Sequence, residues 1–295
     1  APLAQPGAEV RPGEYLLAIN GRPVDVANEV YKGFEGLAGK QTMLTVGPNP
    51  DGAGSRMVKV VPIAEDIPLR LHSWMEANRR LVDTLSGGKL AYVYLPDTYA
   101  GGFANFNRYY FAQVGKQGVI LDERFNHGGD IADFIVDQLK RTPQMVNSGR
   151  EGESVVEPAQ AIYGPKVMII NQMSGSGGDA LPWLFRKAGV GTLVGTRTWG
   201  GLVGIGGYPT LIDGGGITAP RWAIYGTNGE WEVENIGIPP DVEVEQNPAQ
   251  QRLGHDPQLE AAVRIALDAL AKSPPPTFVQ PPAPDRKPVL PDSAD

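Results

Sequence analysis

The sequence has no cysteine among its 295 residues, which excludes disulfides and thiolate chemistry and weakens any expectation of a zinc site. Lys and Arg number 26 against 33 Asp and Glu, the formal net charge is −7, and no basic run is present. This balance argues against nucleic acid or an anionic membrane as the main partner. No apolar run approaches the ~18 residues that a transmembrane helix needs. Nothing at Ala1 has a signal-peptide pattern, although the chain lacks an initiator Met. We therefore expect a cytoplasmic location, no membrane partner, and neither cofactor nor metal.

The composition is that of a globular protein, with 41% hydrophobic and 20% charged residues. This length suits one large or two modest domains. The patterns divide the chain into a β-rich segment at 1–63, a mixed segment at 64–272 and a Pro-rich tail at 273–295. The tail lacks core-forming residues, so we expect it to be disordered.

The first segment contains a short apolar strand closed by a turn, Glu14-Tyr-Leu-Leu-Ala-Ile-Asn-Gly-Arg-Pro-Val24. This stretch resembles the middle of a PDZ domain. A helix is expected at 26–37, and two further strands at 41–46 and 56–62. The first PDZ strands and the carboxylate-binding loop have no counterpart, which indicates a truncated PDZ-like module. A small unrelated β-domain is the alternative.

Beyond residue 63, strands alternate with helices. Apolar residues recur at helical spacing over 67–85, where Gly87 and Gly88 follow, and the helical pattern returns over 131–139 and 256–272. Continuous apolar runs at 118–122, 166–170 and 192–195 are typical of strands buried on both faces of a parallel sheet. These units predict an α/β layer structure, in which ligands bind at the carboxyl ends of the strands.

One such strand end carries a hydroxyl among small residues, Asn171-Gln-Met-Ser-Gly-Ser-Gly-Gly-Asp-Ala-Leu181. Glycines allow tight or left-handed turns and let a ligand approach the main chain. A turn between a strand and a helix N-terminus favours a nucleophile, here Ser176, together with amides that stabilise an oxyanion. An ordinary N-cap turn is the alternative interpretation.

Three separated motifs follow one another in a specific order. They are Asp122-Glu-Arg-Phe-Asn-His-Gly-Gly129, the serine turn, and Thr196-Arg-Thr-Trp-Gly-Gly-Leu-Val-Gly204 with Val233-Glu-Asn-Ile-Gly-Ile-Pro-Pro-Asp241. Together they resemble the S41 serine peptidases, specifically the tricorn branch, over about residues 10–270. The resemblance implies a crotonase-like (ClpP-like) α/β catalytic core preceded by a PDZ domain.

The resemblance also implies roles for individual residues. Ser176 matches the nucleophile, whereas Ser174 falls where the family tolerates other small residues. Glu234 matches the acid that orients and supports the base, with a surface carboxylate as the alternative. The amides of Gly128 and Gly177 match the oxyanion hole, although Gly128 could be a simple turn glycine. If residues 232–234 are extended, Glu232 should face the same side as Glu234.

The base has no match in the chain. In the tricorn branch it is a histidine in a domain before the PDZ, whereas His72, His127 and His255 are the only histidines here. His127 adjoins the expected oxyanion loop and is a weak substitute. A related branch uses a Ser-Lys dyad, but Gly201 occupies the lysine position and Lys187 is expected to be solvated.

The resemblance thus implies a fragment of a tricorn-type serine endopeptidase that cleaves short peptides, lacks the catalytic histidine, and belongs to a homo-oligomer. An inactive peptide-binding or scaffold protein on the same fold is the competing function. A third possibility, an acyl-CoA enzyme on the crotonase fold, is disfavoured because Ser176 and Glu234 fit peptidase motifs.

Overall fold

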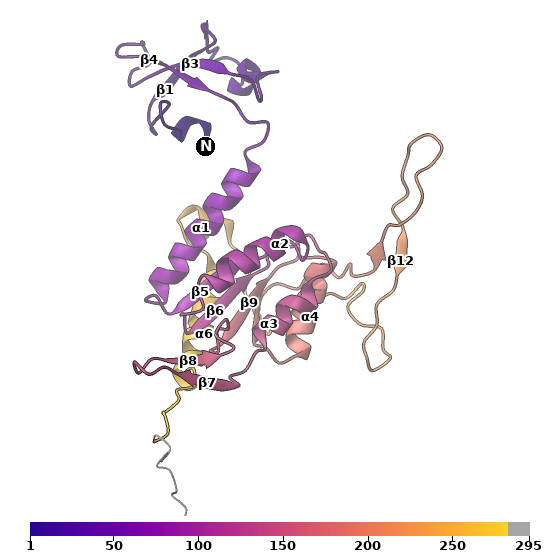
Figure 1. Cartoon of the computed structure of the whole chain (residues 1–295). Helices are drawn as coiled ribbons and strands as arrows, with labels where there is room; N and C mark the ends of the chain where they lie inside the picture. The colour runs from indigo at the N-terminus through magenta and orange to yellow at the C-terminus, as the bar shows by residue number, and fades with distance from the viewer. Residues whose placement is uncertain (283–295) are drawn as a thin grey trace, which may run out of the picture. The chain divides into compact units, whose positions relative to one another are not determined.

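The computed structural model describes residues 1–282 of the chain. These residues form two compact units, with the division between Glu76 and Ala77 (Figure 1). Residues 273–282 contain neither helix nor strand. The rest of the tail that we expect to be disordered, residues 283–295, lies outside the described residues. In the described part no helix is both long enough and apolar enough to span a membrane.

The first unit contains a four-stranded antiparallel sheet with strand order β2-β1-β3-β4. Its strands are β1 (Tyr15–Ile19), β2 (Arg22–Pro23), β3 (Thr42–Gly47) and β4 (Arg56–Val60), preceded by the 3-10 turn η1 (Pro2–Ala4). Alternate residues of β3 and β4 enter a small core made of Ala8, Ile19, Leu44, Val46, Val58 and Val60. The expected helix at 26–37 is wrong: only a 3-10 turn forms there, η2 (Val30–Phe34). Glycines at 33 and 36 disfavour a longer helix.

Helix α1 (Ile67–Leu85) has the bounds that the apolar spacing predicts. Its buried positions are Met75, Asn78 and Val82, spaced three and four residues apart as on one helical face. The helix ends where Gly88, with φ +78, donates its amide to the carbonyl of Asp83 at 2.8 Å.

A five-stranded, fully parallel sheet forms the centre of the second unit, with strand order β13-β10-β9-β6-β5. The strands are β5 (Leu90–Tyr94), β6 (Gly118–Asp122), β9 (Lys166–Ile170), β10 (Thr192–Gly195) and β13 (Val242–Glu243). In register, Leu121 faces Met168 and Met168 faces Leu193. β5 and β6 are buried along their whole length, as expected for strands covered on both faces.

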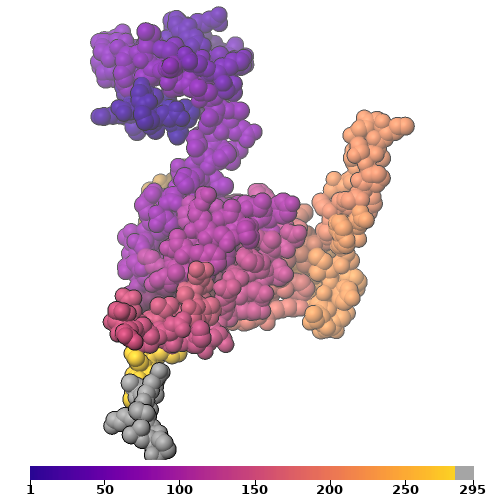
Figure 2. All heavy atoms as spheres, in the orientation of Figure 1, coloured from indigo at the N-terminus to yellow at the C-terminus, as the bar shows by residue number. Residues whose placement is uncertain are grey.

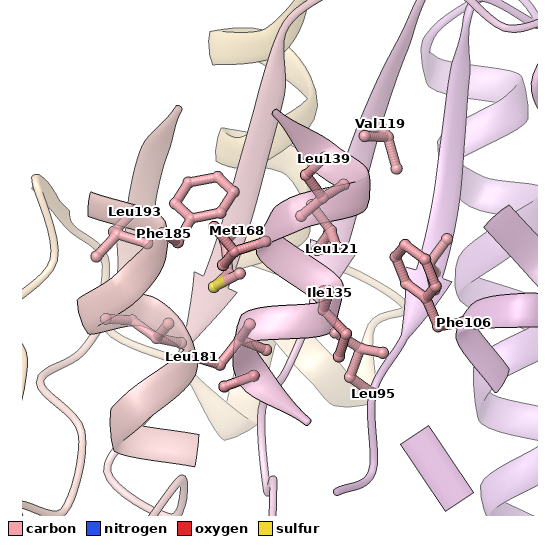
Figure 3. Packing of buried hydrophobic residues seen from close by; sticks show 14 of the residues in the cluster. Leu95, Phe106, Val119, Leu121, Ile135, Leu139, Met168, Leu181, Phe185 and Leu193 are labelled. Carbon is pink, nitrogen blue, oxygen red and sulfur yellow. The ribbon is translucent and has the colours of Figure 1, made fainter. Parts of the chain in front are cut away.

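Helices cover both faces of this sheet. Helices α3 (Ala132–Leu139) and α4 (Gly177–Lys187) pack against each other and, with π-helix η3 (Phe106–Tyr110), close one apolar core. Figure 3 shows this core, with Leu95, Phe106, Val119, Leu121, Ile135, Leu139, Met168, Leu181, Phe185 and Leu193 interleaved between helices and strands. Helix α6 (Pro257–Lys272) packs behind the sheet, against β6, β9 and β10.

Smaller elements lie around this core. They are α2 (Ala100–Asn105), the hairpin of β7 (Met145–Ser148) and β8 (Ser154–Glu157), α5 (Pro248–Arg252), and a ribbon of β11 (Gly204–Ile205) with β12 (Pro220–Trp222). Figure 2 shows the ribbon, in orange, standing out from the rest of the second unit, and nearly all its residues are exposed.

A buried ion cluster joins the end of β6 to the start of α6. The guanidinium of Arg124 donates to Asp122 Oδ2 at 2.6 Å and to Asp256 Oδ1 at 3.0 Å. Asp256 also caps α6 by accepting the amide of Leu259 at 3.1 Å. Asp122 accepts a further hydrogen bond from the hydroxyl of Tyr92 at 2.8 Å. Because each charge has a partner, this cluster can stay buried and fix the loop that follows β6.

Between two members of that cluster lies a carboxyl group with different surroundings. Glu123 is fully buried, and neither of its carboxyl oxygens has a hydrogen-bond partner among residues 1–282. Burial, with smaller contributions from the charges of Asp179 and Asp122, raises the pKa of Glu123 well above its ordinary value of 4.5. The group is therefore neutral in the folded protein at a pH where it would be ionised in the unfolded chain.

We predict that Glu123→Gln stabilises the second unit increasingly as pH rises above about 4.5. Above this pH the folded wild type keeps a proton on Glu123 that the unfolded chain has lost. The free energy of unfolding of the wild type therefore falls as pH rises, by up to about 1.4 kcal/mol per pH unit. Gln does not titrate, so the variant lacks this loss. Urea unfolding at pH 4, 6 and 8 measures the gap. Glu151→Gln, in an exposed turn, is the matched control, and a gap that widens equally in both variants would contradict the prediction.

Candidate active site

The carboxyl ends of β5, β6, β9 and β10 bring four loops together at one edge of the sheet. The connections are made by the backbone. The amide of Gly175 donates to the carbonyl of Asn126 at 3.1 Å, and the amide of Trp199 donates to the carbonyl of Ser174 at 2.9 Å. The amide of Thr98 donates to the carbonyl of Gly128 at 2.9 Å. The serine turn after β9 is thus held from both sides.

Ser176 lies in this turn with a backbone conformation that serine rarely adopts, φ 55° and ψ −117°. Such a conformation costs on the order of 1–3 kcal/mol and persists only where the surroundings enforce it. Here the amide of Ser176 donates to the carbonyl of Gly201 at 2.9 Å, while its own carbonyl accepts the amides of Asp179 and Ala180 at 2.8 and 3.0 Å. The hydroxyl has no hydrogen-bond partner within residues 1–282 and does not cap α4. It is available for chemistry.

Ser174 has a different environment. It is fully buried, and its hydroxyl donates to the carbonyl of Glu123 at 2.8 Å and lies 3.3 Å from Asn171 Oδ1. Since this hydroxyl joins the loops after β6 and β9, Ser174 contributes to structure and only Ser176 has a free hydroxyl in the turn.

The loop that contains Gly128 is in direct contact with Ser176. A Cβ placed on Gly128 would lie 2.7 Å from Ser176 Cβ and 3.0 Å from its Oγ, so no side chain fits at a residue whose φ is already +92. Gly177 is equally restricted, because a Cβ there would lie 1.9 Å from Thr98 Oγ1. Both glycines named by the sequence therefore lie beside the serine turn.

The amides of these glycines are not equivalent. The amide of Gly128 donates to Asn126 Oδ1 at 2.9 Å. The amides of Gly177 and Gly129 have no hydrogen-bond partner among the described residues. Gly177 is the first residue of α4, where unpaired amides and the helix dipole favour a negative charge.

A buried carboxylate, Asp179, fixes the loop after β10 against α4. It accepts hydrogen bonds from the hydroxyl of Thr198, at 2.5 Å, from the amide of Gly200 at 2.8 Å and from the amide of Gly201 at 3.1 Å. Burial raises the pKa of Asp179, and these hydrogen bonds oppose the rise. The carbonyl of Gly201 accepts a hydrogen bond from the amide of Ser176. Asp179 therefore positions Ser176 indirectly, through Gly201.

Glu234 supports the same loop one residue further on. Its Oε2 accepts the amides of Leu202 at 2.7 Å and of Val203 at 2.6 Å. The N–H of Leu202 and the carbonyl of Gly201 belong to one peptide group, so a single peptide group links the carboxylate of Glu234 to the amide of Ser176. The acid that the sequence names is therefore connected to the serine turn.

Glu232 does not contact the loop that Glu234 supports. The expectation that residues 232–234 are extended is wrong. Val233 and Asn235 have positive φ values of 76° and 60°, and the segment forms turns. The carboxylate of Glu232 instead accepts from Trp183 Nε1 and from Lys187 Nζ, both at 2.9 Å. Lys187 is exposed, as expected, and it also pairs with Glu232 and lies 4.2 Å from the Trp183 ring centre.

None of the basic side chains in the described residues is hydrogen-bonded to Ser176. His127 is exposed, with its backbone amide on the carbonyl of Pro96, and His255 Nδ1 lies 3.0 Å from Glu260 Oε1. Burial lowers the pKa of Lys166 to about 8, but this residue begins β9, at the opposite edge of the sheet from the serine turn. Residues 1–282 also contain no group of three or more His, Asp or Glu that could hold a metal ion.

Sequence reasoning missed the functions of Asp179 and of the Thr198-Trp-Gly-Gly201 loop. Both were part of quoted motifs, but their contact joins residues about twenty positions apart, across two strands, and no local periodicity reports it. The buried Glu123 was also missed, although its charged type at the end of an apolar strand was a visible signal.

Comparison with known proteins identifies the family. The family model for peptidase family S41 matches residues 89–244, and that for the tricorn protease PDZ domain matches residues 1–65. Tricorn protease homolog 1 of Streptomyces coelicolor is 39% identical over 93% of this chain and 26% of its own length. The tricorn protease of Thermoplasma acidophilum is 34% identical over 88% of this chain and 24% of its own length.

The crystal structure of the tricorn protease superposes with a TM-score of 0.81 at 33% identity, covering 88% of this chain and 25% of that one. This chain therefore spans about a quarter of the length of the relatives it matches. The expected α/β core preceded by a β-rich PDZ-like module is confirmed. The chain belongs to peptidase family S41 and is a tricorn-like member of it.

Proposed function

We propose that this chain supplies the nucleophile, the oxyanion amides and the acid of a tricorn-type serine endopeptidase that cleaves short peptides. The observation that carries the proposal is the free hydroxyl of Ser176, enforced in a left-handed conformation at the start of α4. A serine hydroxyl needs a base to take its proton. We propose that this base is a histidine outside residues 1–295.

In this mechanism the Oγ of Ser176 attacks the peptide carbonyl carbon, and its proton passes to the base. The carbonyl oxygen becomes an oxyanion beside the amides of Gly177 and Gly128. Gly128 can donate to it only after its hydrogen bond to Asn126 Oδ1 breaks. The base then protonates the departing amine, and water releases the acyl group from Ser176. Two such donors contribute several kcal/mol to the rate.

Glu234 is proposed to orient and electrostatically support the histidine. One of its oxygens, Oε2, accepts two loop amides. The other oxygen has no hydrogen-bond partner among the described residues, so it can accept a hydrogen bond from the N–H of a protonated imidazole. Peptide substrates, a homo-oligomeric assembly and a cytoplasmic location accompany this proposal, because they follow from the family resemblance.

An inactive peptide-binding or scaffold protein is the competing function. It is favoured by one observation, that no basic side chain in residues 1–282 is hydrogen-bonded to Ser176. The two functions differ in whether Ser176 reacts once a base is provided.

We predict that a fluorophosphonate labels residues 1–295 slowly, and that added imidazole accelerates the labelling by replacing the absent base. Peptide hydrolysis by the chain alone should be reduced by about 10⁴-fold or more relative to a complete triad. Intact-mass spectrometry should show labelling of wild type and Ser174→Ala but not of Ser176→Ala.

Labelling that survives Ser176→Ala would remove the nucleophile assignment. Labelling of wild type that imidazole fails to accelerate would favour the scaffold function. Rapid peptide hydrolysis without imidazole, abolished by His127→Ala, would instead assign the base to His127.

Glu234→Gln should slow the imidazole-assisted labelling of Ser176 by roughly tenfold or more, because the developing imidazolium loses its carboxylate. The melting temperature should change little, since the remaining carbonyl oxygen still accepts the loop amides. Glu232→Gln is the matched control and should leave the labelling rate nearly unchanged, because its contacts are with Trp183 and Lys187. Equal rates in the two variants would exclude Glu234 from the mechanism.

Gly128→Ala should abolish labelling of Ser176, because the new methyl group would overlap the serine side chain. Gly152→Ala provides a control at nearly the same backbone conformation, with φ +93 against +92 and open space around the Cβ. Both variants carry the cost of a left-handed alanine, so the difference in labelling measures the contact with Ser176. Similar labelling rates in both would mean that Gly128 is only a turn glycine.

A further inference from the structure

The side chain of Trp199 is 70% exposed, yet its ring packs against the turn that contains Ser176. A Cβ on Gly175 would lie 2.6 Å from Trp199 Cε3, and one on Gly201 would lie 2.5 Å from its Cζ3. The benzene ring of the indole therefore rests on two glycines that have no side chains to displace it. Gly175 directly precedes Ser176, and Gly201 accepts the amide of Ser176.

The other exposed tryptophans of the second unit have different surroundings. Trp231 is also 70% exposed, but its ring stacks edge-on with Tyr225, at 5.4 Å between centroids. Trp222 packs beside the guanidinium of Arg221 in the projecting ribbon. Within residues 1–282, the ring of Trp199 has no aromatic or cationic partner, and its indole Nε1 has no acceptor. Its outward face is open next to the reactive hydroxyl.

The groups around Trp199 favour an apolar ligand over a cationic one. Arg197, two residues away, is exposed and donates to the carbonyl of Ile236 at 3.2 Å, so the loop carries a positive charge. The side chain of Ile236 is itself exposed, and its backbone lies 3.0 Å from the Cβ position of Gly200. One oxygen of Glu234 accepts two amides, and the other is the proposed partner of the base. Trp199 and Ile236 thus offer apolar surface, while the free charge nearby repels a cation.

We propose that Trp199 is a specificity-determining residue, whose outward indole face binds an apolar side chain of the peptide beside the bond that Ser176 attacks. Gly175 and Gly201 are glycines because they seat the ring against the nucleophile turn. An aromatic ring fixed in this way loses little conformational entropy when a peptide side chain packs on it. This inference rests on the proposed function of Ser176.

The test uses the full 295-residue chain and a panel of fluorescein-labelled alanine hexapeptides in which one position carries Phe, Leu, Lys or Ala. Fluorescence anisotropy gives the dissociation constant of each peptide. At one peptide position, Phe and Leu should bind wild type about tenfold more tightly than Ala or Lys. Trp199→Ala should abolish this preference, whereas Trp199→Phe should keep most of it. Trp231→Ala, matched in residue type and exposure, should keep it in full.

Trp199→Glu gives a readout that a merely structural role would not produce. At the same peptide position, the preference should change from Phe and Leu to Lys, because a carboxylate replaces the ring. A preference that survives Trp199→Ala and Trp199→Glu, an equal loss in Trp231→Ala, or no preference in wild type would overturn the inference.

Labelling of Ser176 distinguishes the two proposals. If the imidazole-assisted fluorophosphonate still labels Ser176 in wild type but no preference depends on Trp199, only the specificity of this subsite is wrong. If wild type is not labelled, the proposed function itself fails, whatever the peptide panel shows.

Discussion

The geometry of the candidate active site depends on the hydrogen bonds that the buried carboxylate of Asp179 accepts. It lies in the first turn of α4 and accepts three hydrogen bonds from Thr198, Gly200 and Gly201. A buried carboxylate is stable only when it is well hydrogen-bonded, so the loop after β10 cannot move away without exposing an unsatisfied charge. The strained conformation of Ser176 is maintained through this loop.

The remaining contacts of the site extend from the same loop. The Gly201–Leu202 peptide group joins the amide of Ser176 to the carboxylate of Glu234, and the indole of Trp199 covers Gly175 and Gly201. The proposed nucleophile, the proposed acid and the proposed substrate contact are therefore positioned by one short segment. Rigid elements place this segment within hydrogen-bond distance of each group, as catalysis requires.

Much of the fold could be predicted because its signals are local. The helical spacing over 67–85 gave the bounds of α1, and the apolar run at 118–122 gave those of β6. Strand order then explains why Gly128 and Ser176 meet, since β6 and β9 are neighbours whose carboxyl ends lie at one edge. Loop conformations could not be predicted where a residue has backbone angles that its type rarely adopts. Val233, a β-branched residue, has φ 76°, and no sequence pattern indicates this.

The site residues show the same division. Ser176, Gly128 and Gly177 were named from motifs that resemble those of family S41, and the strand-turn-helix pattern also singled out Ser176. Asp179 and Trp199 act through contacts with loops distant in the chain, which composition and spacing do not report. Glu123 was overlooked because burial of a carboxyl group without a partner runs against the usual pairing of residue type and environment.

The strand order of the central sheet determines how much of the chain must be synthesised before the contacts around Ser176 can form. Ser176 is held by a loop that follows β10, and that loop is held by Glu234, close to the start of β13. Contacts between segments far apart in sequence form late in folding, because the intervening chain must first be ordered. A chain synthesised only as far as the start of α4 contains Ser176 but not the loop that holds it. The contacts that fix the backbone of Ser176 are therefore complete only once synthesis has passed residue 234.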